Sequence, residues 1–129
     1  MSSNPTAAYK ESHVTTADPI TLVVMLFDGA LKAVRKARIH HESGDRARYA
    51  AEIQRASLIV GELLSALDMD QGELPRTLSG IYTYSIQGLM DAALGNVARL
   101  DEVEKNLGTI GQAWRQLAKA IAEGDGDLA

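Results

Sequence analysis

The sequence predicts an all-α fold: an antiparallel up-down four-helix bundle with a mobile N-terminal arm. Apolar residues recur every three to four positions in four segments, and Gly, Pro, Ser and Asp gather between those segments. Aromatic residues make up only 5% of the chain, which favours helices over strands. Because the connections are short, consecutive helices are expected to run antiparallel.

The chain divides into three predicted parts. Residues 1–17 form the arm, in which Tyr9 and Val14 are the only substantial apolar side chains. Residues 18–123 form the bundle, and residues 124–129 form a disordered tail that frays into solvent.

The first two helices have recognisable start signals. Asp18 followed by Pro19 predicts a helix that runs to about His41, because aspartate caps exposed amides and proline suits a first turn. The turn at 43–45 supplies a glycine and the next cap, and a second helix follows to about Asp68. The predicted buried stripes are Ile20, Val24, Phe27, Leu31 and Val34 in the first helix, and Tyr49, Ile53, Ala56, Val60, Leu63 and Leu67 in the second.

The last two helices follow the same pattern. Pro75 predicts the start of a third helix that ends near Asn96, and a fourth is expected from about Asp101. The predicted stripes are Leu78, Tyr82, Ser85, Leu89 and Ala92 or Ala93 in the third, and Val103, Leu107, Ile110, Trp114, Leu117 and Ile121 in the fourth.

Composition excludes several classes of function. A length of 129 residues suits one domain, and a net charge of −4 disfavours nucleic acid as a partner. The chain has no cysteine, so disulfides and thiol chemistry are excluded. No segment approaches the roughly 20 apolar residues of a membrane span, and we therefore expect a cytoplasmic protein that does not insert into a membrane.

The sequence does not predict an enzyme, a metal site or a cofactor. A di-iron bundle needs a Glu-x-x-His on each of two helices, and His13, His40 and His41 have no glutamate three residues upstream. A histidine phosphotransfer bundle is an alternative of similar length. Against that alternative, His40 and His41 lie at a predicted helix end rather than within a helix.

Two uncharged helix faces predict a partner-binding surface. Residues 77–90 carry no charge, and a second uncharged run lies between Arg55 and Glu62. Because a solvated helix face normally carries charge at every turn or two, we expect a groove for a helical partner between the second and third helices. Its predicted residues are Leu58, Gly61, Ser65, Gly80, Thr83, Tyr84, Gln87 and Gly88.

The first helix adds a second apolar candidate. Leu22, Met25 and Leu26 fall outside its main stripe, in a run without charge. Self-burial is the competing interpretation, in which the arm folds over one of these patches and nothing else binds.

Several of these residues resemble a known family in order along nearly the whole chain. The matching pieces are Tyr9-x4-Val14-x-Thr16-Ala17-x-Pro19, Met25-Leu26-Phe27-Asp28-Gly29-Ala30, Glu62-Leu63, Gly72-Glu73-Leu74, Leu78-x2-Ile81-Tyr82-x-Tyr84 and Trp114. This combination resembles the flagellar secretion chaperone family, FliS. The chain departs from the family pattern at Phe27, where tyrosine is usual, and in the turn at Gly72, where a second glycine is common.

The resemblance implies a function for the predicted surface. It implies a cytoplasmic chaperone that binds the C-terminal segment of flagellin, keeps flagellin from polymerising early and delivers it to components of the flagellar type III export apparatus. It also implies that the arm around Tyr9 and Val14 acts as a lid over part of the flagellin site. Two alternatives remain open: a non-catalytic regulatory or adaptor bundle, which includes the phosphotransfer type, and a structural subunit that pairs with copies of itself.

Overall fold

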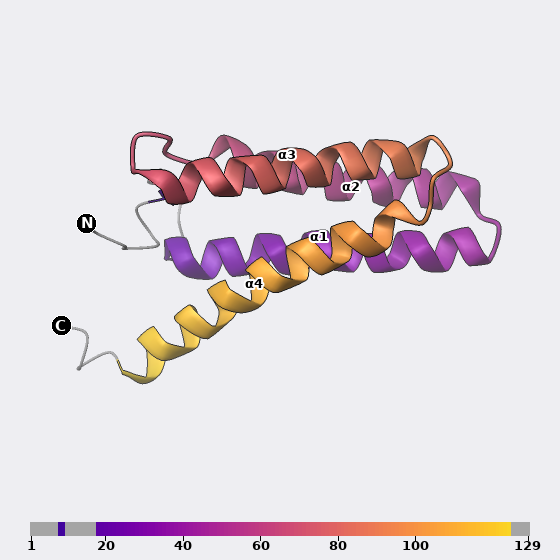
Figure 1. The fold of residues 1–129 in the computed structure, drawn as a ribbon. Coiled ribbons are helices and arrows are strands. Elements are labelled where there is room, and N and C mark those ends of the chain that lie inside the picture. The colour runs from indigo at the N-terminus through magenta and orange to yellow at the C-terminus, as the bar shows by residue number, and fades with distance from the viewer. Residues whose placement is uncertain (1–7, 10–17, 125–129) are drawn as a thin grey trace.

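The computed structural model describes residues 8–9 and 18–124, and these form four helices. They are α1 (Pro19–Glu42), α2 (Arg46–Ser65), α3 (Glu73–Ala93) and α4 (Arg99–Glu123). Consecutive helices run in opposite directions, and α4 crosses the others obliquely so that its C-terminal end lies away from them (Figure 1). Helix α1 packs against α2 and α4, and α3 packs against the same two helices. The predicted all-α four-helix bundle is confirmed.

Local chemistry accounts for the helix starts. The carboxylate of Asp18 accepts a hydrogen bond from the amide of Thr21 at 2.8 Å, and that of Asp45 accepts one from the amide of Arg48 at 3.1 Å. Both predicted caps are therefore confirmed. Gly72 precedes α3 with a φ of 98°, a left-handed conformation that favours glycine.

Within the described ranges, none of the helices is long and apolar enough to cross a membrane.

The buried stripes form one apolar core. Most stripe residues of α1, α2 and α3 are buried, but Val24 and Tyr49 are only partly buried and Val23 is buried in place of Val24. Those of α4 divide along its length: Val103, Leu107 and Trp114 are buried, whereas Ile110, Leu117 and Ile121 are only partly buried. The apolar stripe of α4 is therefore incompletely covered toward its C-terminus.

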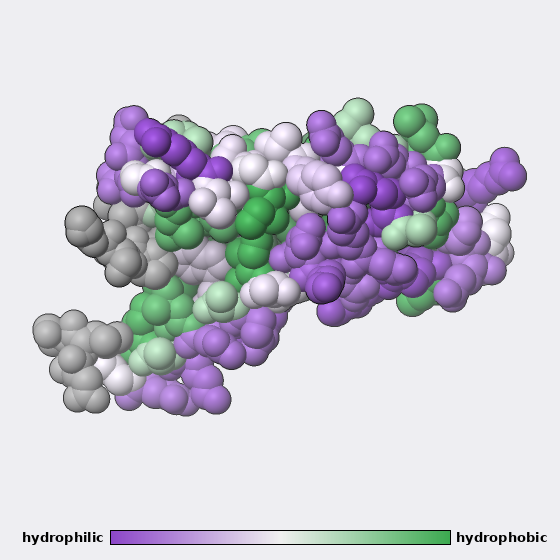
Figure 2. All heavy atoms as spheres, in the orientation of Figure 1, coloured by the Kyte–Doolittle hydropathy of each residue, from purple (hydrophilic) through white to green (hydrophobic). Residues whose placement is uncertain are grey.

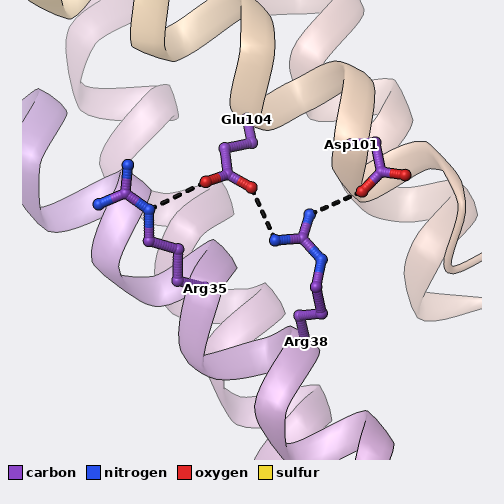
Figure 3. A network of polar contacts seen from close by, with 4 residues as sticks. All are labelled: Arg35, Arg38, Asp101 and Glu104. Carbon is purple, nitrogen blue, oxygen red and sulfur yellow. Dashed lines mark hydrogen bonds and ion pairs between the residues drawn. The ribbon is translucent and has the colours of Figure 1, made fainter.

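An ion network fixes the N-terminal half of α4 to α1 (Figure 3). Glu104 accepts hydrogen bonds from Arg35 at 2.9 Å and Arg38 at 2.7 Å, and Arg38 also reaches Asp101 at 2.9 Å. Burial disfavours the charged form of Glu104, but the two arginine hydrogen bonds outweigh this effect and lower its pKa. The network therefore stabilises the fold at neutral pH and loses this contribution as the pH falls through the lowered pKa.

The predicted outward orientation of Gly88 is wrong. Gly88 is buried where α3 meets α4, and a Cβ atom at this position would lie 2.8 Å from Cγ2 of Val103. The guanidinium of Arg99 also lies over this position, with nitrogens 3.6 and 3.7 Å from the same point. The glycine is thus needed for helix contact, because any side chain would separate the two helices.

Two alanine substitutions test this assignment as a matched pair. We expect Gly88→Ala to lower the free energy of unfolding by about 1–3 kcal/mol through overpacking. Gly80→Ala, on the same helix, meets no atom within 4 Å and is expected to raise it by up to about 1 kcal/mol. Urea unfolding followed by circular dichroism measures both, and equal stabilities of the two variants would contradict the close contact at Gly88.

Candidate partner-binding site

Two residues of the arm pack onto the bundle at the end of α2. Tyr9 forms an isolated antiparallel bridge with Leu67, and the amide of Asp68 donates a hydrogen bond to the carbonyl of Ala8 at 2.6 Å. This pairing accompanies the end of α2 at Ser65, three residues before the predicted end at Asp68. An extended backbone segment thus pairs with the chain that leaves α2.

The side chain of Tyr9 fills a seat between α3 and α4. Its hydroxyl lies 2.5 Å from the hydroxyl of Tyr82, and its ring meets Trp114 in an edge arrangement with centroids 5.4 Å apart. Burial raises the pKa of Tyr9 to about 12, partly offset by the hydrogen bond with Tyr82, and burial also raises the pKa of Tyr82. Both phenols are therefore neutral at physiological pH, and one donates to the other.

This seat differs from the sequence-based expectation. Ala8 and Tyr9 of the predicted mobile arm are buried against the bundle, while Val14 lies outside the described residues. The seat residues Leu67, Tyr82 and Trp114 were predicted only as members of core stripes. The available signal was the hydroxyl of Tyr82 in an otherwise apolar stripe, since a buried phenol requires a hydrogen-bond partner.

A hollow of about 410 Å³ opens between α3 and α4, here called the α3–α4 hollow. Its lining comprises Thr77, Gly80, Ile81 and Tyr84 of α3 and Lys105, Asn106, Thr109 and Ile110 of α4. Figure 2 shows apolar side chains gathered in a band between these helices. No atom lies within 4 Å of the Cβ position of Gly80, so this glycine leaves its share of the wall open.

The seat of Tyr9 adjoins the α3–α4 hollow. Ile81 of the hollow precedes Tyr82, and Ile110 lies one helical turn before Trp114. A second hollow of about 430 Å³ lies between the first turn of α1 and the last turns of α4. The two hollows thus border α4 before and after Trp114, at residues 105–110 and at residues 118–122.

Two residues predicted for the groove between α2 and α3 lie elsewhere. Gly80 and Tyr84 face α4 instead of α2, because both line the α3–α4 hollow. The hydroxyl of Tyr84 donates to Glu102 at 2.8 Å, and the guanidinium of Arg99 lies 5.0 Å from the centre of its ring. Tyr84 thus belongs to the contact between α3 and α4.

The remaining predicted residues lie outside the lining of this hollow. Leu58 is 65% exposed and Met25 is 57% exposed, as predicted for outward positions. Ser65, Thr83 and Gln87 are exposed, whereas Gly61, Leu22 and Leu26 are half-buried. The structure therefore separates the predicted residues into a pair on the α3–α4 hollow and a group spread over α1, α2 and the outer face of α3.

The site offers shape and apolar surface for binding. In the parts of the chain that the structure describes, no three His, Cys, Asp or Glu side chains gather as a metal site would require. Histidines 40 and 41 lie in the last turn of α1. What the arrangement provides is a hollow between two helices, next to a seat that holds an extended segment with one large ring.

Comparison with known proteins assigns the family. The model of the family described as flagellar protein FliS matches residues 2–121. The chain belongs to the FliS family. It is 40% identical to the flagellar secretion chaperone FliS of Salmonella typhimurium over 84% of this chain and 82% of that protein. It is 33% identical to that of Bacillus subtilis over 88% and 85% of the two chains, and 32% identical to that of Escherichia coli over 82% and 80%.

Membership in the FliS family confirms the resemblance noted in the sequence. The names of these relatives support a chaperone of flagellar secretion, and the apolar hollow of this FliS family member suits the binding of another chain. At Phe27, where the family usually has tyrosine, the ring is fully buried, 6.0 Å from that of Tyr82.

Because the docked arm holds Tyr9 as a neutral phenol, we expect alkaline pH to weaken its docking. The unfolded chain ionises Tyr9 near its ordinary pKa of 10.0, whereas the folded protein holds this proton to about 12. The contribution of Tyr9 to stability is therefore complete below the first value and is lost as the pH rises toward the second. We expect the emission of Trp114, the only tryptophan, to shift to longer wavelength over this range as water reaches the indole.

Tyr9→Phe serves as the control, because it keeps the ring at Trp114 and removes the hydroxyl. Its emission is expected to change less over the same pH range. An identical pH profile in both proteins would show that ionisation of Tyr9 does not govern the docking of the arm.

Proposed function

We propose that this protein is a cytoplasmic export chaperone that binds the C-terminal segment of flagellin. In this proposal it keeps flagellin from polymerising early and assists its delivery to the flagellar type III export apparatus. The observation that carries the proposal is the α3–α4 hollow beside a seat filled by the protein's own arm, in a chain that belongs to the FliS family.

The physical requirements of such a ligand agree with this surface. An assembly segment that is disordered before polymerisation needs its apolar face covered, and it forms an amphipathic helix when it binds. Ordering that segment costs free energy, so a large contact area still leaves a moderate affinity. Moderate affinity suits a chaperone because the cargo must be released at the export apparatus.

In this proposal the arm is a lid that competes with flagellin. Tyr9 occupies the seat between Tyr82 and Trp114 next to the hollow, so a ligand helix that extends along α4 would meet its ring. Flagellin binding then displaces residues 8–9, and the free protein keeps its apolar seat covered until the cargo arrives.

Substitution of one glycine in the hollow tests the site. Gly80→Glu places a charge in the wall of the α3–α4 hollow and is expected to weaken binding of a flagellin C-terminal peptide by about tenfold or more, because the carboxylate must lose water. The matched control is Gly108→Glu on α4, which also meets no atom within 4 Å and lies outside the lining. Isothermal titration calorimetry measures both, and equal affinities of the two variants would place flagellin elsewhere.

Removal of residues 1–15 tests the lid. If the arm covers the seat about nine-tenths of the time, its removal is expected to strengthen flagellin binding by about tenfold, and a weaker lid gives a smaller gain. Tyr9→Ala is the companion variant, since it keeps the arm and removes only its ring. Loss of flagellin binding in both variants, with the helical circular dichroism retained, would show that the arm contacts flagellin instead of excluding it.

A further inference from the structure

Charge is distributed unevenly along the chain. Residues 32–55, which form the end of α1, the connecting turn and the start of α2, contain seven Lys and Arg against three Asp and Glu. The remainder of the chain contains six Lys and Arg against fourteen Asp and Glu. The segment that joins α1 to α2 is therefore basic in an acidic protein, and its own surface attracts negative charge.

Part of this basic charge is not neutralised within the bundle. Arg35 and Arg38 are held by Glu104 and Asp101 (Figure 3), but Lys36 forms no ion pair among the residues that the structure describes. Arg48 approaches Asp45 only at 3.5 Å, with a side chain that is 74% exposed. An exposed pair of this kind contributes little to stability, so the guanidinium of Arg48 remains available to a partner.

An apolar hollow lies among these basic groups. It has a volume of about 500 Å³ and is lined by Lys36, Ile39 and His40 of α1 and by Arg48, Ala51 and Glu52 of α2. Ile39 is 61% exposed there, although it belongs to a well-formed helix. Ile39 thus combines an exposed apolar side chain with cationic neighbours. This combination is typical of interfaces in which charge orients the partner and one apolar contact anchors it.

We propose that this basic hollow around Ile39 is a second docking surface, and that it binds an acidic segment of a partner protein that carries one apolar anchor. The acidic side chains of the segment pair with Lys36 and Arg48, and its apolar side chain covers Ile39 and Ala51. Charge complementarity selects this occupant, because Lys36 and Arg48 outnumber Glu52 in the lining and Glu52 is paired with Arg55.

The position of the surface separates it from the site proposed for flagellin. The basic hollow is lined by residues of α1 and α2, whereas the α3–α4 hollow is lined by residues of α3 and α4, so the two share no residue. Tyr9 contacts Leu67, Tyr82 and Trp114, none of which lines the basic hollow.

A titration of the ¹⁵N-labelled full chain tests the proposal. The probe is a short helical peptide of Glu and Ala around a central Leu, and the control peptide has Gln in place of every Glu. We expect chemical-shift changes concentrated at Ile39, His40 and Ala51 with the acidic peptide and much smaller ones with the control. The double variant Lys36→Glu with Arg48→Glu is expected to weaken binding about fivefold or more.

The matched control variant is Arg76→Glu with Lys119→Glu, which changes the net charge equally on α3 and α4. It is expected to bind the acidic peptide as the unchanged protein does. Equal losses in both double variants, equal binding of the Gln peptide, or no shifts around Ile39 would each overturn the proposal. Equal binding of a single-stranded oligonucleotide at the same residues would also overturn it, because nucleic acid would then be the occupant. Chemical shifts at these residues that depend on protein concentration without peptide would overturn it too, because a second copy of the chain would then be the occupant.

Discussion

The close contact of α3 with α4 at Gly88 is the constraint on which the rest of the structure depends. Val103 packs directly against the backbone at Gly88, and the ion network around Glu104 holds the same half of α4 on α1. With its N-terminal half fixed and its axis oblique, α4 leaves the bundle toward its C-terminus (Figure 1). The apolar side chains of that half are then only partly covered. Incomplete closure of the bundle thus leaves the end of α4 partly exposed, beside the hollow that it shares with the first turn of α1.

The arm completes the core at the point where the helices part. The ring of Tyr9 packs against one side of Trp114. The hydroxyl of Tyr9 is the hydrogen-bond partner that the buried hydroxyl of Tyr82 requires. Loss of the arm therefore exposes both an apolar surface and an unpaired phenol. The last layer of the core is therefore a short segment that lies outside the four helices.

Sequence reasoning was most successful where one residue determines local geometry. The caps at Asp18 and Asp45 depend on nearest neighbours along the helix, and they were predicted correctly. Most stripe residues were also predicted correctly, although Val23 is buried in place of Val24. The prediction failed where two helices must be placed relative to each other. An uncharged face has the same pattern whether it meets solvent, a partner or a neighbouring helix, so Gly88 and Tyr84 were assigned to the wrong side. The bridge between Tyr9 and Leu67 joins positions far apart in sequence, and no local pattern specifies it.

The backbone pairing of Ala8 with Asp68 has a further consequence for selectivity. A segment attached to the molecule it covers competes at an effective concentration of the order of millimolar. If the arm is a lid as we propose, a foreign chain must bind the seat more strongly than this attached segment does, so weakly apolar chains are excluded. The number of residues between Tyr9 and α1 sets the effective concentration of the arm at its seat. An insertion or deletion in this connection would therefore change the selectivity and leave the contacts within the bundle unchanged.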